Sequence, residues 1–235
     1  MIQITRSVAR HHADHGWLQT HWHFSFSDYY DEKNMNWSAL RVFNDDVIQP
    51  DSGFPMHAHR DMEIITYVIT GQLEHQDHLG NRGLINPGEV QVMSAGKGIR
   101  HSEFNPSKDT PVHLLQLWIL PRHKGNPPRW EQRQFSPAER AGKLLPVISS
   151  GEVPNTLKID QAATVFVSRL STGQKVAHHS QPGRYAYLFV ISGGITLNGQ
   201  SLSAGDQARM ADETNLELTA VEDAELILLD LPPKE

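Results

Sequence analysis

Two short histidine-containing segments carry the residues best suited to chemistry. The first reads His57-Ala58-His59 and the second reads His101-Ser102-Glu103. Because residues i and i+2 of an extended strand face the same side, each segment would present two ligating side chains on one face. Two such strands side by side would aim three imidazoles and one carboxylate at a common point. The pattern therefore predicts a site for one divalent transition metal, with His57, His59, His101 and Glu103 as ligands.

The donor set indicates which kind of metal site to expect. Nitrogen and oxygen ligands suit Fe(II), Mn(II), Ni(II) or Cu(II), and the chain has no cysteine for a closed thiolate zinc site. A ligand set that leaves coordination positions open is what catalysis requires. We expect one divalent ion, Fe(II) first, with Ni, Cu, Mn or Zn as alternatives. Glu103 is also the candidate catalytic base, if a substrate proton lies within its reach.

Other polar residues near this pattern have a structural interpretation beside the chemical one. Glu63 could be a further ligand, but we favour a structural partner or an acceptor that orients an imidazole. The stretch His21-Trp22-His23 has the spacing of a metal-binding pair without a second pair nearby, so aromatic packing is expected. His75 and Asp77 share a face, and a solvated hairpin is favoured over a place behind the metal site.

The elements that must position these residues are mostly strands. Short runs rich in β-branched and aromatic residues recur between glycine, proline and asparagine turn signals, which is typical of a sandwich or barrel. The expected strands are Leu40 to Ile48, Glu63 to Ile69, Glu89 to Met93, Val112 to Leu120, Thr164 to Leu170, Arg184 to Ile191, Gly194 to Leu197 and Glu225 to Leu231.

The strand runs fall into two comparable halves. In each half, an apolar strand ending at a glycine leads into a hairpin and then a Pro-Gly or Ala-Gly turn. We therefore expect a first β-barrel domain with the metal site over residues 1–125 and a metal-free second barrel over residues 144–235. In the second half His178 and His179 are adjacent, so they would face opposite sides of a strand. The linker, residues 126–143, contains a helix predicted over Ser136 to Lys143.

The composition indicates which binding partners and which cellular compartment to expect. Hydrophobic residues make up 38% of the 235 residues, enough to bury a core, and no run is long enough to cross a membrane as a helix. The formal net charge is −6 without a block of like charge, so neither nucleic acid nor a membrane is the expected partner. The absence of cysteine, with no apolar leader at the start, favours the reducing cytoplasm.

At this point the sequence resembles the cupin superfamily and, within it, the pirin family, close to the bacterial pirin-like quercetin 2,3-dioxygenases. The resemblance rests on several motifs, which together cover roughly residues 15 to 120, while the match is looser from Lys143 onward. They are Gly16-Trp17-Leu18, Phe24-Ser25-Phe26, Tyr29-Tyr30-Asp31, Leu40 to Asp46, Gly53 to Gly71, His75-Gln76-Asp77, Pro87-Gly88 and Met93 to Glu103.

The resemblance implies an all-β bicupin with one metal in the first barrel and ligand positions at His57, His59, His101 and Glu103. It also implies an enzyme that cleaves a flavonol such as quercetin with O₂, so the expected partners are a small aromatic molecule and O₂. Pirins are linked to regulation as well. The alternative is thus a non-enzymatic, metal- or redox-responsive binding protein, which leaves a protein partner open. A zinc hydrolase or isomerase is a third, weaker option.

Overall fold

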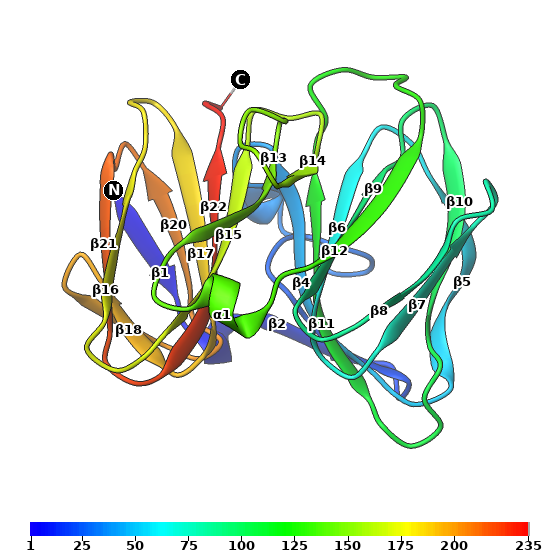
Figure 1. Cartoon of the computed structure of the whole chain (residues 1–235), viewed down its shortest axis with the longest axis horizontal. Coiled ribbons are helices and arrows are strands. Elements are labelled where there is room, and N and C mark those ends of the chain that lie inside the picture. The colour runs from blue at the N-terminus through cyan, green and yellow to red at the C-terminus, as the bar shows by residue number, and fades with distance from the viewer. Residues whose placement is uncertain (235) are drawn as a thin grey trace.

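The first half of the chain forms a barrel of two facing antiparallel sheets in the computed structural model, which describes residues 1–234 (Figure 1). The larger sheet has the order β12 (Arg129–Gln134), β9 (Glu89–Ser94), β6 (Glu63–Thr70), β11 (Val112–Ile119), β4 (Leu40–Ile48), β3 (Leu18–Trp22) and β2 (His11–Asp14). The smaller sheet has the order β5 (Ser52–His59), β10 (Ile99–Asn105), β7 (Leu73–Asp77) and β8 (Arg82–Ile85).

The second half repeats this arrangement beside the first. Its larger sheet has the order β1 (Ile2–Thr5), β20 (Gln207–Ala211), β17 (Tyr185–Ser192), β22 (Ala224–Leu231), β15 (Thr164–Leu170), β13 (Leu145–Ser149) and β14 (Leu157–Lys158). Its smaller sheet has the order β16 (Lys175–His179), β21 (Asn215–Ala220), β18 (Gly194–Leu197) and β19 (Gln200–Ser203). All strand pairs are antiparallel except β13 with β14. The expected all-β fold with two cupin-like barrels is confirmed.

The two larger sheets pack against each other, which explains their burial on both faces. Every residue of β22 is buried, and so are the first six residues of β6. One apolar cluster contains Phe43 and Leu117 from the first barrel together with Tyr187 and Leu229 from the second. The smaller sheets bury one face only, as the alternation along β10 shows. The interior of the first barrel therefore lies between β10 and the larger sheet of that barrel.

The strands expected from sequence are present, with ends that differ by at most one residue. The expected helix is shorter than predicted, since α1 covers only Pro137–Arg140. Ser136 caps it in a reciprocal capping box with Glu139, but Ala141 is already extended. Two 3₁₀ turns complete the helices, η1 (Ser7–Ala9) and η2 (Glu32–Asn34). None of the helices in the described part of the chain is long and apolar enough to cross a membrane.

Two short strands tie the halves together. β12 lies within the stretch expected to be a linker and pairs with β9 of the first barrel. β1, at the very start of the chain, pairs with β20 of the second barrel, and Figure 1 shows this blue strand among the orange and red ones. The N-terminal segment thus crosses from the second barrel to the first before β2 begins.

Candidate metal centre

The two histidine-containing segments lie side by side as β5 and β10. His57 is directly opposite His101 across this strand pair, and His59 is opposite Ile99. The register shifts between His101 and Glu103, so that Glu103 pairs with Phe54. His101 and Glu103 are buried on the inner face of β10, whereas His57 and His59 lie at the more open rim of β5. The same-face arrangement expected from the spacing is therefore present on both strands.

The structure brings three of the predicted ligands into one group and the fourth into an overlapping group. His57, His59 and His101 each offer a ring nitrogen within 4.8 Å of the other two. Glu103 forms a second group of the same dimension with His101 and His75. His101 belongs to both groups, so the two together make one continuous cluster of potential ligands.

The nitrogen atoms of His101 and His57 are arranged as metal ligands require. His101 Nε2 is buried and has no hydrogen-bond partner, an arrangement that is costly unless a ligand fills it. His57 Nδ1 lies 2.8 Å from the carbonyl oxygen of Pro55, so it donates there and leaves the lone pair of Nε2 free. These residues therefore fit a metal ion.

A relay through His75 orients His101. His75 is fully buried on β7, where its Nε2 lies 3.5 Å from Asp77 Oδ2 and its Nδ1 lies 3.5 Å from His101 Nδ1. If His75 donates to the Asp77 carboxylate, its other nitrogen accepts from His101 and the His101 Nε2 lone pair faces the cluster. The favoured solvated hairpin is therefore not what the structure shows at His75, because β7 pairs directly with β10.

Burial keeps the imidazoles of His59 and His101 neutral. Burial first, and nearby imidazoles second, lower the pKa of His101 to about 3 and that of His59 to about 4. A neutral imidazole is the form that binds a metal. No proton has to leave either ring at neutral pH before a metal can bind.

The carboxylate of Glu103 is held by side chains from the opposite sheet. Gln116 Nε2 donates to Oε2 at 2.6 Å, while Thr66 Oγ1 and Gln91 Nε2 donate to Oε1 at 3.3 Å each. These residues lie on β11, β6 and β9 and are direct cross-strand neighbours. A row of three neighbouring side chains across the larger sheet therefore positions Glu103.

Two indoles in turn orient the glutamines. Trp118 Nε1 donates to Gln116 Oε1 at 3.2 Å, and Trp130 Nε1 donates to Gln91 Oε1 at 2.7 Å. With its oxygen occupied, each amide can only present its NH₂ group to Glu103. Sequence reasoning missed these glutamines; their one signal was a polar residue inside an otherwise buried strand.

The cluster opens into a cavity of about 350 Å³ with a mostly aromatic lining. The ring of His59 stands edge-on to Trp118, with 4.9 Å between the centroids. Residues from the first strands and from β4, β5, β10 and β11 form the wall. They are His15, Trp17, Leu18, Trp22, Phe26, Ser27, Asn44, Asp46, Phe54, His57, His59, Glu103, Gln116 and Trp118. The site can therefore receive a flat, largely apolar molecule beside the imidazoles.

Two polar side chains in the wall of this cavity lack partners. Asn44 Oδ1 and Asp46 Oδ1 are buried without a hydrogen bond, and the two residues share one face of β4. Burial raises the pKa of Asp46 to about 7, so this carboxyl is partly protonated at neutral pH. Sequence reasoning did not single out either residue. They are suited to hydrogen-bond polar groups of a bound molecule.

The remaining histidines and acids with suggestive spacing have structural partners. Glu63 lies on β6, not beside His59 on β5, and accepts from Ser94 Oγ at 2.5 Å. His23 is buried and stacks on Phe43 with 4.6 Å between ring centroids. In the second barrel, His178 Nε2 lies 2.6 Å from Asp230 Oδ2.

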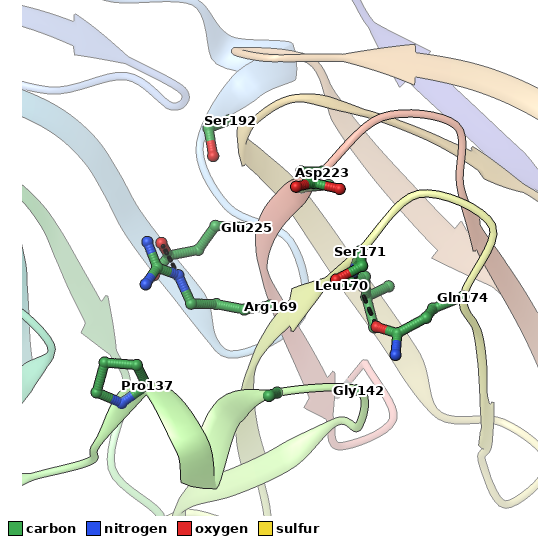
Figure 2. Close-up of a pocket in the computed structure, with 11 residues that line it drawn as sticks. Pro137, Gly142, Arg169, Leu170, Ser171, Gln174, Ser192, Asp223 and Glu225 are labelled. Atoms are coloured by element: carbon green, nitrogen blue, oxygen red, sulfur yellow. Dashed lines mark hydrogen bonds and ion pairs between the residues drawn. The ribbon is translucent and has the colours of Figure 1, made fainter.

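A larger cavity of about 470 Å³ lies away from this cluster, beside α1 (Figure 2). Figure 2 shows Arg169 paired with Glu225 at its wall, and Arg169 Nε lies 2.9 Å from Glu225 Oε2. Its lining contains no histidine. We place the candidate chemistry at the smaller cavity, because that is where unpartnered ligand atoms lie.

Comparison with known proteins gives matches over both halves of the chain. The Pirin family model matches residues 3–119, and a model described as quercetinase C-terminal cupin domain matches residues 147–231. A relative from Escherichia coli (strain K12), named quercetin 2,3-dioxygenase, is 44% identical and aligns over 99% of this chain and 100% of its own length. A pirin-like protein from Caulobacter vibrioides is 46% identical over 93% of this chain and 94% of its own. The crystal structure of the Escherichia coli bacterial pirin YhhW in complex with nickel(II) has a TM-score of 0.94 at 42% identity, covering 99% of this chain and 100% of that one.

Proposed function

Because this chain belongs to the pirin family, we propose that it is a metal-dependent dioxygenase that acts on a flavonol-type substrate, such as quercetin, with O₂. The observation that carries the proposal is the cluster of imidazole nitrogens and Glu103 at the wall of an aromatic cavity. The name of the Escherichia coli relative supports the substrate class.

His57, His59, His101 and Glu103 are the proposed ligands of one divalent ion. Fe(II) is our first expectation, and the nickel complex of the Escherichia coli pirin supports Ni(II) as the second. When bound, such an ion would act as a Lewis acid toward the oxygen atoms of the substrate. We propose a first domain of residues 1–125 that holds the site, a connection of residues 126–143 and a second domain of residues 144–235. Two strands pair outside these ranges, since β1 joins the sheet of the second barrel and β12 joins the sheet of the first.

The cavity wall would hold the substrate by its flat face and by its polar edge. The indoles of Trp22 and Trp118 and the ring of Phe54 offer apolar surface to an aromatic ring system. Asn44 Oδ1 and the carboxyl of Asp46 have free hydrogen-bonding capacity for hydroxyl groups. A polyhydroxylated aromatic molecule has both kinds of surface.

Glu103 would accept the proton of the substrate hydroxyl group that faces the cluster. Its Oε2 is held at 2.6 Å by Gln116, whereas Oε1 receives only two longer bonds of 3.3 Å. Oε1 is therefore the oxygen better able to take a proton. Gln116 and Gln91 would keep the carboxyl group in place while its charge changes.

The experiment is aerobic turnover of quercetin by protein loaded separately with Fe(II), Ni(II), Cu(II) or Mn(II). We expect O₂ uptake matched to quercetin loss with at least one metal, and neither without O₂. His101→Ala should abolish both metal retention and turnover. The matched control His21→Ala, in the other His-x-His stretch, should retain both. Absence of turnover with all four metals would contradict the proposed substrate.

A further inference from the structure

A polar cavity of about 270 Å³ lies where the N-terminal segment meets both barrels, and Trp22 is the one lining residue that it shares with the cavity beside the proposed metal site. Gln3 and Thr5 of β1 pair with Arg209 and Gln207 of β20, and all four line it. The opposite wall comes from the first barrel, from the stretch around His23 and the loop that contains η2. Both barrels therefore contribute to this cavity.

Arg209 is a buried cation in this wall with no carboxylate partner. It is 9% exposed and forms no ion pair within residues 1–234. Its Nη2 donates to the carbonyl oxygen of His23 at 2.9 Å and to Asn34 Oδ1 at 2.7 Å, but its Nε is buried without a partner. The guanidinium lies 4.4 Å from the centroid of Phe24, which supports one face. A buried charge without a counter-charge is costly, so an anion beside it would be stabilising.

The other charged groups of the cavity leave an excess of positive charge. Arg10 is paired with Asp45 at 2.7 Å, yet its Nε is also buried without a hydrogen bond. Lys33 and Asp31 lie at the exposed rim, and Asp31 Oδ1 accepts from the backbone nitrogen of Lys33. Arg209 thus remains the uncompensated charge of the cavity.

A directional chain of hydrogen bonds adds one more donor. Arg10 Nη1 lies 3.1 Å from His23 Nε2, so this nitrogen is the acceptor and His23 Nδ1 carries the proton that it donates to the Tyr187 hydroxyl at 2.6 Å. Tyr187 in turn donates to Gln207 Oε1. The amide nitrogen of Gln207, which has no acceptor among residues 1–234, is left as a donor beside Arg209.

We propose that this cavity is a second ligand site, which binds a small oxyanion, a carboxylate or a phosphate, through Arg209, Gln207 and Lys33. Guanidinium and amide donors in one wall match the paired oxygen atoms of such a group. Because the cavity is built from both barrels, the anion stabilises their contact.

The test is calorimetric titration of the intact protein with inorganic phosphate and, separately, with succinate, against sodium chloride at matched ionic strength. We expect saturable binding of at least one oxyanion at one site per chain, with a rise in Tm as its concentration increases. The two titrations distinguish phosphate from carboxylate ligands. Absence of saturable binding for both would overturn the proposal.

Variants separate an anion site from a purely structural role of Arg209. Arg209→Met keeps an unbranched chain over Phe24 but removes the charge, so the oxyanion should bind at least tenfold more weakly and the rise in Tm should vanish. Lys33→Gln, at the exposed rim, should weaken binding several-fold without affecting folding. Arg82→Met, the control, removes an arginine that is exposed on the first barrel. This variant should bind the oxyanion with the affinity of the unaltered protein. Unchanged affinity in both Arg209→Met and Lys33→Gln would also overturn the proposal.

Discussion

At the residue scale, hydrogen bonds behind the ligands decide which atoms are free to bind. His57 and His101 each have one ring nitrogen engaged, by Pro55 and by His75, and this leaves the other nitrogen available. Glu103 is a ligand candidate because three donors fix its position without surrounding it. The same type of side chain, Glu63, is a structural acceptor on β6 of the opposite sheet. The identity of a residue therefore does not by itself decide its role.

Asp46 should make the stability of the metal-free protein depend on pH. In the unfolded chain this carboxyl loses its proton near its ordinary pKa of about 3.9, whereas in the folded chain burial raises the pKa to about 7. Between these values the folded state holds a proton that the unfolded state has lost. The contribution of Asp46 to stability therefore falls as pH rises from about 4 to about 7 and is constant above that.

The variant Asp46→Asn lacks this contribution of Asp46 to the pH dependence of stability. The free energies of unfolding of the variant and of the unaltered protein are measured by urea unfolding at pH 5, 6, 7 and 8. The buried histidines have lowered pKa values and act in the opposite direction, so the quantity to follow is the difference between the variant and the unaltered protein. We expect the variant to gain relative stability as pH rises to about 7, by at most about 1.4 kcal/mol per pH unit. A difference that does not change with pH would show that Asp46 is ionised throughout.

At the scale of the elements, the pairing of β5 with β10 builds the cluster. Gly53 allows the two strands to approach, because a Cβ atom placed there would lie 2.2 Å from the carbonyl oxygen of Glu103 and 2.6 Å from the Cα atom of Phe104. Both are backbone atoms, which cannot move away as the end of a side chain can. The opposite sheet contributes Gln91 and Gln116, which hold Glu103.

Gly53→Ala should therefore push β5 away from β10 and loosen the candidate metal site. We expect a loss of about 2 kcal/mol in unfolding free energy and a metal affinity about tenfold lower. Urea unfolding of the metal-free protein and calorimetric titration with Ni(II) measure the two effects.

The matched control is Gly194→Ala in β18 of the second barrel. There the nearest atom to an added Cβ is the end of the Val221 side chain at 3.1 Å, which can shift. Its metal affinity should be unchanged. Equal metal affinity in Gly53→Ala and the unaltered protein would contradict the assigned role of the glycine.

At the scale of the whole molecule, a buried network joins the barrels. Arg140 of α1 lies 2.7 Å from Glu225 of β22, and both contact the hydroxyl group of Tyr67 on β6. Arg169 pairs with the second oxygen of Glu225 at the edge of the cavity in Figure 2. Together with the shared apolar cluster, this network should make the two barrels unfold as one unit.

Arg140→Met should destabilise the protein by about 3 kcal/mol, because the buried carboxylate of Glu225 then keeps Arg169 as a positively charged partner but loses Arg140. The measurement is urea unfolding followed by both tryptophan fluorescence and circular dichroism. Arg82→Met, at an exposed ion pair, should cost less than about 1 kcal/mol. Two separate transitions in the unaltered protein would show that the network does not couple the barrels.

The donor types, their same-face spacing and most of the strands follow from the sequence alone, because side-chain alternation is a local property of an extended backbone. The sequence correctly predicted an all-β chain of two barrels, and it placed His57, His59, His101 and Glu103 on two strands that lie together. Their role as ligands stays a prediction.

The surroundings of those four residues depend on contacts between separate segments of the folded chain. Gln91 and Gln116 lie on other strands, 12 and 13 residues from Glu103 in the chain, and reach it from the opposite sheet, so their role depends on how the sheets pack. The pairing of β1 with β20, the relay through His75 and the cavity around Arg209 likewise require contacts between segments that no local pattern links. Sheet register and packing between the barrels are properties of the whole chain, and they completed both candidate sites.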